Sequence, residues 1–215
     1  MRRGLALFLV LAALPGLALP GTASKPRHDL DSSAWTDKYD THFRKYTKRY
    51  FGPGFDWRWF KSQGVAESGL RNNAVSTAGA VGIMQIRPST YEEIQEKSPY
   101  LSMGSLSDPR WNIAAGIFYD SILFKRWLKS ADHETLEDDL YMTFASYNAG
   151  HSKMLRIVHK VKKKKEEQPS KWEEVKPYAP SQTRHYIDRI RFLMGKDSEE
   201  TALLKRTGYQ PKHIS

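Results

Sequence analysis

Residues 57–86 read WRWFKSQGVAESGLRNNAVSTAGAVGIMQI, and the character of this stretch changes halfway along it. The first half is rich in apolar and aromatic residues, and Asp56 before it is a residue type that favours a helix N-cap. The second half is rich in Gly, Ala, Ser and Asn, which favour turns. We therefore predict a helix that ends near Gly69, followed by a loop with one or two short strands over residues 69–87.

Glu67 stands at the junction of the two halves. Helical spacing places it on the same face as Phe60, Gln63 and Gly64. A carboxyl group beside apolar residues is poorly solvated, which raises its pKa and lets it donate a proton near neutral pH. The alternative is an ordinary surface glutamate at a helix end.

The rest of the chain is predominantly helical in pattern. Aromatic residues recur at three- and four-residue steps over residues 35–50, which is typical of an amphipathic helix. Pro88 and the Asp108-Pro109 pair favour helix starts. Further helices are predicted at 109–129, 136–146, 151–160 and 183–194, with a break at 148–150 and a solvated loop, rather than a wall-binding patch, at the charge run 162–167. The fold class is therefore mainly α: a single domain over residues 35–195 with a small irregular β segment.

The two ends of the chain have different compositions. Arg2 and Arg3 precede a short apolar run at residues 5–14 and small residues at 21–24, which is typical of a secretory signal peptide. We predict a signal peptide at 1–23, a flexible linker at 24–34 and a polar tail at 196–215. An uncleaved N-terminal anchor is the alternative, although the apolar run is shorter than the roughly 20 residues of a membrane span.

Composition narrows the function classes. The 215 residues contain no cysteine, which excludes disulfides, cysteine-held metals and a lipid anchor on cysteine. The seven histidines form no His-x3-His pair, so we predict no metal, and no motif calls for a cofactor. The formal charge of +10 favours anionic partners such as a wall or membrane surface, and the expected export argues against nucleic acid.

Three blocks of sequence together carry a resemblance to a known family. They comprise Glu67-Ser68-Gly69 with Ser76 and residues 78–86, then Ala145-Ser146-Tyr147-Asn148-Ala149-Gly150, and then Gln182-Thr183-Arg184-His185-Tyr186. In this order and spacing the chain resembles the soluble-type lytic transglycosylases, which have a goose-type-lysozyme-like fold. The resemblance implies an α+β lysozyme-like fold, with the β segment forming a groove for glycan strands.

The resemblance also implies roles for individual positions. Glu67 matches the sole catalytic acid and base, and Ser68 follows it as in the family's Glu-Ser pair. The positions that the resemblance assigns to substrate binding are Ser68, Ser76, Met84, Gln85, Tyr147, Asn148 and Tyr186. The departures are Gln182, where Glu is common, Ser146, where Ala or another small residue is usual, and Ile83 in place of a common Leu.

The implied reaction cleaves the β-1,4 bond between N-acetylmuramic acid and N-acetylglucosamine without water and leaves a 1,6-anhydromuramyl product. No cofactor is needed, the partner is peptidoglycan, and the location is the periplasm or cell envelope. No Asp or Glu lies between Ser68 and Tyr91, where a second carboxylate might be expected. The alternatives are a hydrolase on the same fold, a glycan-binding module without catalysis, and a wall-remodelling enzyme that serves a secretion apparatus.

Overall fold

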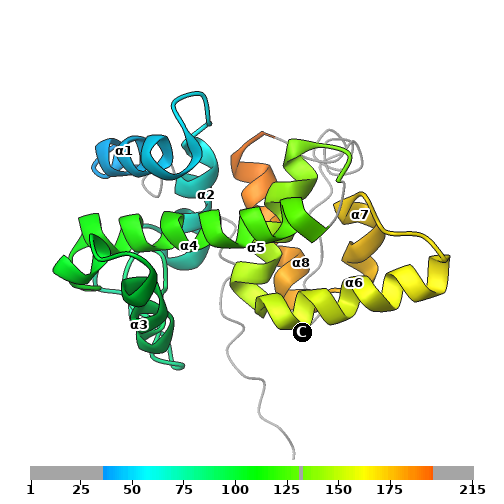
Figure 1. Cartoon of the computed structure of the whole chain (residues 1–215). Helices are drawn as coiled ribbons and strands as arrows, with labels where there is room; N and C mark the ends of the chain where they lie inside the picture. Colours follow the sequence, from blue (N-terminus) through cyan, green and yellow to red (C-terminus); the bar gives the residue numbers. More distant parts are fainter. Residues whose placement is uncertain (1–35, 131–132, 196–215) are drawn as a thin grey trace, which may run out of the picture.

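Helix α5 is the element around which the other helices gather. In the computed structural model, which describes residues 36–130 and 133–195, α5 packs against α4, α6 and α8, and α4 also packs against α1 (Figure 1). The helices are α1 (Asp40–Phe51), α2 (Arg58–Ser68), α3 (Pro88–Lys97), η2 (Leu101–Met103), α4 (Pro109–Ser130), α5 (Leu136–Ala149), α6 (His151–Lys165), α7 (Trp172–Val175), η3 (Lys176–Tyr178) and α8 (Ser181–Leu193). The predicted mainly α fold is confirmed.

The predicted helix starts are confirmed where local capping chemistry specifies them. Helix α3 begins at Pro88, whose missing N–H costs nothing in a first turn. Helix α4 begins at Pro109, and the Asp108 carboxylate accepts the backbone N–H of Arg110 at 2.8 Å. Asp56 likewise accepts the N–H of Arg58 at 3.0 Å at the start of α2.

Three local predictions were wrong. The segment 69–87 contains no strand in this part of the structure, only isolated bridges from Val81 to Val75 and to Ile86. Helix α5 runs on to Ala149, so the break comes at Gly150 rather than at Asn148. The lysines of the charge run are exposed as predicted, but they form the last turn of α6, because lysine is a good helix former and cations are favoured at a helix C-terminus.

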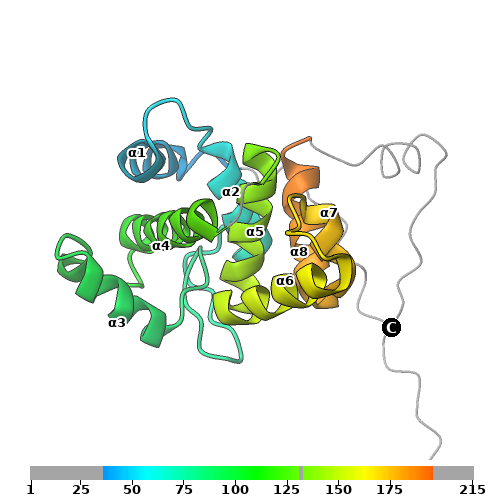
Figure 2. The ribbon, with the colours of Figure 1, turned by 45° about the vertical axis from the view of Figure 1, so that its right-hand side comes forward.

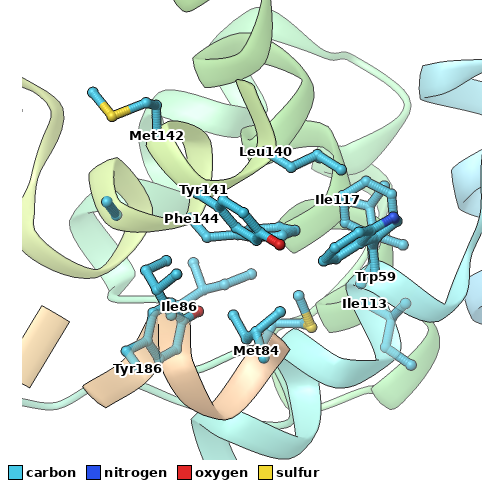
Figure 3. Close-up of a cluster of buried hydrophobic side chains, with 14 of the residues drawn as sticks. Trp59, Met84, Ile86, Ile113, Ile117, Leu140, Tyr141, Met142, Phe144 and Tyr186 are labelled. Carbon is cyan, nitrogen blue, oxygen red and sulfur yellow. The ribbon is translucent and has the colours of Figure 1, made fainter. Parts of the chain in front are cut away.

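The core is aromatic and fills the space between α2, α4, α5 and α8. Figure 3 shows Trp59 and Phe144 in this cluster, together with Met84 and Ile86 from the segment after α2 and Tyr186 from α8. Figure 2 shows that segment descending between α3 and α5. Because its apolar side chains are part of the core, the segment is anchored although it has no regular secondary structure.

Some of the predicted features lie outside the part of the chain that the structure describes. The signal peptide, the linker, Trp35 and the tail at 196–215 lie outside them. Among the helices that are described, none combines the length and the apolar character needed to cross a membrane. The domain boundaries therefore stay predictions.

A buried ion pair joins α1 to α2. The Lys61 ammonium is fully buried and lies 2.6 Å from an Asp40 carboxylate oxygen, with the Trp57 ring 5.5 Å away. We expect Asp40→Ala to lower the free energy of unfolding by about 3 kcal/mol, because it leaves a buried ammonium without its carboxylate. Denaturant unfolding measures this, with Asp37→Ala at an exposed position as the control. Equal stability of the two variants would contradict the expectation.

Candidate active site

Glu67 lies in the last turn of α2, which ends at Gly69 in the left-handed conformation. One carboxylate oxygen, Oε1, accepts a hydrogen bond of 2.7 Å from the Tyr186 hydroxyl. The residue keeps some contact with solvent, but its surroundings are mostly protein. Burial raises the pKa of Glu67 to about 7, and the Tyr186 hydrogen bond opposes the rise by favouring the charged form. A large fraction of the molecules therefore carries a protonated Glu67 at neutral pH.

Helices α2, α4, α5 and α8 each contribute an ionisable group to the interior around Glu67. Asp120 comes from α4, Tyr147 from α5 and Tyr186 from α8. Burial is the main cause that raises the pKa of each of these three groups, and the charge of Glu67 raises all three further. They therefore form one electrostatically coupled cluster.

Asp120 is the member of this cluster that we did not predict. It is a second carboxyl group near Glu67, and it comes from a distant part of the sequence. A signal was present, because Asp120 follows Ile113 and Ile117 on the apolar stripe of α4, where a charged residue is unusual. The lone-carboxyl interpretation holds for the matched sequence blocks but not for the space around Glu67.

The segment after α2 carries Ser76 and Gln85. The Ser76 hydroxyl accepts the N–H of Ala80 at 3.0 Å, which closes a turn. Gln85 has a φ of 46°, and its side-chain amide donates to the carbonyl oxygens of Gly82 at 2.9 Å and Ala74 at 3.3 Å. Both side chains are partly exposed, so they remain candidates for contact with a substrate.

Asn112 holds this segment against α4 and was also missing from the prediction. Its Oδ1 accepts the N–H of Met84 at 2.8 Å, and its Nδ2 donates to the carbonyl oxygens of Val81 and Leu106 at 2.9 Å and 3.0 Å. Gly82, with a φ of 78°, makes room for this side chain, since an added Cβ would lie 2.3 Å from Nδ2. The glycine therefore serves a close approach as well as a turn.

The structure places two predicted substrate contacts in the interior. The Ser68 hydroxyl donates to the carbonyl oxygen of Ile83 at 2.9 Å and accepts the N–H of Arg71 at 3.1 Å. The Met84 side chain is fully buried, and its predicted place in the groove stays a prediction. Both residues fix the course of the segment that follows α2.

Tyr147 and Asn148 connect α5 to its neighbours. The Tyr147 hydroxyl donates to the carbonyl oxygen of Met84 at 2.7 Å, and its ring lies edge-on to Tyr119. The Asn148 side-chain oxygen accepts a hydrogen bond of 2.9 Å from the buried Thr183 hydroxyl, which links the second sequence block to the third. The structure therefore brings the blocks together around Glu67.

A separate hollow of about 410 Å³ lies between α5, α7 and α8 and is lined by Tyr141, Trp172 and Arg191 among others. Its lining does not include Glu67 or the other predicted site residues. Over residues 36–130 and 133–195 there is also no cluster of three His, Asp or Glu side chains arranged to hold a metal ion.

Comparison with known proteins gives a consistent answer. The sequence model of the Transglycosylase SLT domain matches residues 51–169. The chain is 34% identical over 143 residues to the membrane-bound lytic murein transglycosylases C of Yersinia pestis (strain Pestoides F) and Yersinia pseudotuberculosis (serotype O:1b), which covers 65% of this chain and 38% of each relative. It thus spans well under half the length of these curated relatives.

The structural comparison concerns the fold. An inactive mutant of the lytic transglycosylase Slt from Pseudomonas aeruginosa superposes with a TM-score of 0.57 at 18% sequence identity, over 83% of this chain and 26% of that one. At this identity the likeness establishes a shared fold and nothing about individual side chains. The match of the family model over more than half of the sequence decides the assignment: this chain belongs to the Transglycosylase SLT domain family.

Proposed function

We propose that this chain is an exported peptidoglycan lytic transglycosylase that cleaves the MurNAc–GlcNAc β-1,4 bond and leaves 1,6-anhydromuramyl ends. The observation that carries the proposal is Glu67, whose pKa is raised to about 7 by burial and whose carboxylate accepts a hydrogen bond from Tyr186. Family membership and the names of the relatives support the same reaction. The catalytic domain would be residues 35–195, acting in the periplasm or cell envelope.

In the proposed mechanism Glu67 acts twice. Protonated Glu67 donates its proton to the glycosidic oxygen, and the C1–O bond of the muramyl residue breaks. The substrate's acetamido group stabilises the cation that develops at C1. The Glu67 carboxylate then takes the proton from the muramyl 6-hydroxyl, whose oxygen bonds to C1 and closes the anhydro ring. The Tyr186 hydrogen bond favours the carboxylate form that this second step needs.

The other predicted site residues would surround the sugar. We assign substrate contact to Ser76 and Gln85 on the segment after α2, where both are partly exposed, and to Tyr147 and Asn148 at the end of α5. The Tyr147–Met84 hydrogen bond joins that end of α5 to the segment, and in the proposal these groups form one surface. A glycan strand would lie along it.

A hydrolase is the main rival, because a second carboxylate could activate water on the opposite side of the sugar. Asp120 is near Glu67, but it is fully buried and its Oδ1 is bonded to Gln63. It has no access to a water that attacks a substrate. Mass spectrometry of digested sacculi separates the two reactions, since anhydro ends lack one water relative to reducing ends. Products with only reducing ends would refute the proposal, and no released product would favour a glycan-binding module.

The pH dependence of the rate follows from Glu67. A free enzyme that must begin with a protonated acid is most active below the pKa of that acid. We therefore expect kcat/KM to be highest on the acid side and to fall tenfold per pH unit above about pH 7, the pKa of Glu67. Turbidity clearance of sacculi between about pH 5 and about pH 9 measures this. A rate that rises through neutral pH would contradict a protonated Glu67.

Tyr186→Phe tests the hydrogen bond directly. That bond lowers the pKa of Glu67, so its removal is expected to raise the pKa and move the alkaline fall of kcat/KM to higher pH. We expect a shift of about half to one pH unit, with kcat lowered about tenfold because the carboxylate loses a donor. Tyr178→Phe, at a partly exposed tyrosine of η3, is the matched control. An unchanged pH profile for Tyr186→Phe would remove the bond from the mechanism.

The wider setting also enters only as a proposal. The formal charge of +10 would favour peripheral association with an anionic wall or membrane surface. Because the chain spans 38% of the curated relatives it matches, their partners and regulation are not carried over to it. The substrate we propose is the peptidoglycan strand, with no metal and no cofactor.

A further inference from the structure

Asp120 and Gln63 form an incomplete pair in the interior behind Glu67. Both side chains are fully buried, and Gln63 Nε2 donates to Asp120 Oδ1 at 3.2 Å. The remaining oxygen of each, Gln63 Oε1 and Asp120 Oδ2, is buried and has no hydrogen-bond partner among the described residues. Two acceptors are thus left unsatisfied on two side chains that already share one hydrogen bond.

One proton satisfies both oxygens. A protonated carboxyl group and a carboxamide can bond reciprocally, with the N–H donating to the carbonyl oxygen of the acid and the acid O–H donating to the amide oxygen. An ionised Asp120 would instead be a fully buried charge with a single neutral donor, which costs several kcal/mol. Exchanging the amide's nitrogen and oxygen leads to the same requirement, because one acid proton is still needed to face the amide oxygen.

The surrounding charges act in the same direction. Among the described residues, four ionisable groups interact electrostatically with Asp120. They are Glu67 on α2, Tyr119 on α4, Tyr147 on α5 and Tyr186 on α8. Burial raises the pKa of Asp120 well above its ordinary value, and a charge on Glu67 raises it further. Two carboxyl groups in one poorly solvated region do not both ionise, and the deeper one keeps its proton.

We propose that Asp120 is a neutral carboxylic acid paired with Gln63, and that this pair is a positioning device for Glu67. Gln63 precedes Glu67 by one helical turn on the same face of α2, so the pair ties that face to α4. Because Asp120 stays neutral, no second negative charge lies near Glu67. Of the two carboxyl groups, Glu67 and Asp120, only Glu67 then ionises during the reaction. The statement about activity rests on the proposed function, whereas the protonation of Asp120 does not.

The protonation is tested by NMR on the full chain labelled with ¹³C at the aspartate carboxyl groups. The Asp120 resonance is identified by its absence in Asp120→Asn. We expect it to stay at the position of a protonated acid from about pH 5 to about pH 8, where the carboxyl group of an aspartate in a model peptide is ionised. A carboxylate position for Asp120 at neutral pH would overturn the proposal.

The role in catalysis is tested by two substitutions. Asp120→Leu removes the acid and leaves the Gln63 amide unpaired, so we expect kcat to fall at least about tenfold. Asp120→Asn can pair with Gln63 again, so we expect it to restore most of the rate with the alkaline midpoint of the pH profile unchanged. If Asp120 were ionised, Asp120→Asn would remove a charge near Glu67 and lower that midpoint by about one pH unit or more.

The NMR titration and the two substitutions distinguish failure of the proposed function from failure of the Asp120 proposal. If the parent chain releases no anhydro product, the proposed function fails, and the NMR titration still decides whether Asp120 is protonated. If Asp120→Leu does not fold, the midpoint of Asp120→Asn carries the test alone. A lowered midpoint in Asp120→Asn, or full activity in Asp120→Leu, overturns the positioning role.

Discussion

Replacing Glu67 with glutamine is expected to lower the rate of glycan cleavage by about 10³-fold or more, because the amide can neither donate the proton nor take it back. The activity that remains should equal the background release of product from purified sacculi without enzyme. The measurement is release of anhydromuramyl products by mass spectrometry at about pH 6, where the parent Glu67 is protonated. The matched control is Glu92→Gln at an exposed position of α3, which should retain the parent rate.

The same substitution should leave the fold intact. The pKa of Glu67 is raised from 4.5 to about 7 on folding, so its ionised form is disfavoured in the folded state. Below the unfolded-state pKa of 4.5, Glu67 does not destabilise the fold. The destabilisation grows as the pH rises from 4.5 to about 7, the folded-state pKa, and is complete above it. Glutamine has no charge to bury, so the Tm of Glu67→Gln at about pH 8 should equal or exceed that of the parent. A lower Tm, or retained product release, would contradict the assignment.

The helices were predictable wherever a local signal set their limits. Pro88 and Pro109 mark starts because the proline ring suits a first turn, and Gly69 marks an end because it adopts a left-handed φ of 65°. Such signals act within a few residues. The short helix α7 starts after Lys171, which is not a usual N-cap residue, although Glu174 accepts the Lys171 backbone N–H; its Trp172 is buried by tertiary packing, and the helix was not predicted.

The residues of the candidate site likewise fall into those that the sequence predicted and those that depend on the packing of distant elements. Glu67 could be predicted from its place at a helix end beside a glycine-rich segment, and Tyr147 and Tyr186 from a resemblance of whole sequence blocks. Asp120 and Asn112 could not be placed, because their roles depend on which face of α4 meets α2 and the segment 69–87. Composition gives the residue types of a core, but the pairing of buried polar groups is decided by the packing of distant elements.

Asn112 shows why this matters for activity. Gln85 and the Met84 carbonyl that binds Tyr147 lie on a segment without regular secondary structure. Its own backbone hydrogen bonds close turns and isolated bridges, such as the exchange between Val81 and Ile86, where the N···O distances are 2.9 Å and 3.1 Å. Two of the three hydrogen bonds of Asn112, those to Met84 and Val81, attach this segment to helix α4. The position of the proposed substrate contacts relative to Glu67 therefore depends on this buried amide together with the Ser68–Ile83 and Tyr147–Met84 hydrogen bonds.

We accordingly expect Asn112→Ala to lower the free energy of unfolding by about 3 kcal/mol, since the buried Met84 N–H and the partly buried Val81 and Leu106 carbonyl oxygens each lose a hydrogen bond. For a chain of this size that corresponds to a fall in Tm of about 10 °C. Activity at a temperature where the variant is folded should drop more than about tenfold, because the Gln85 segment is released. Asn112→Asp keeps the acceptor for Met84 but cannot donate to Val81 or Leu106, so it should be impaired as well.

The control for Asn112 is Asn73→Ala, at an exposed position of the same segment, which should change the stability by less than about 0.5 kcal/mol. Thermal unfolding and product release measured on the same samples separate loss of fold from loss of geometry. If Asn112→Ala melted within about 2 °C of the parent, the amide would be dispensable. The segment would then be held by its buried Ile83, Met84 and Ile86 side chains and by the hydrogen bonds from Ser68 and Tyr147.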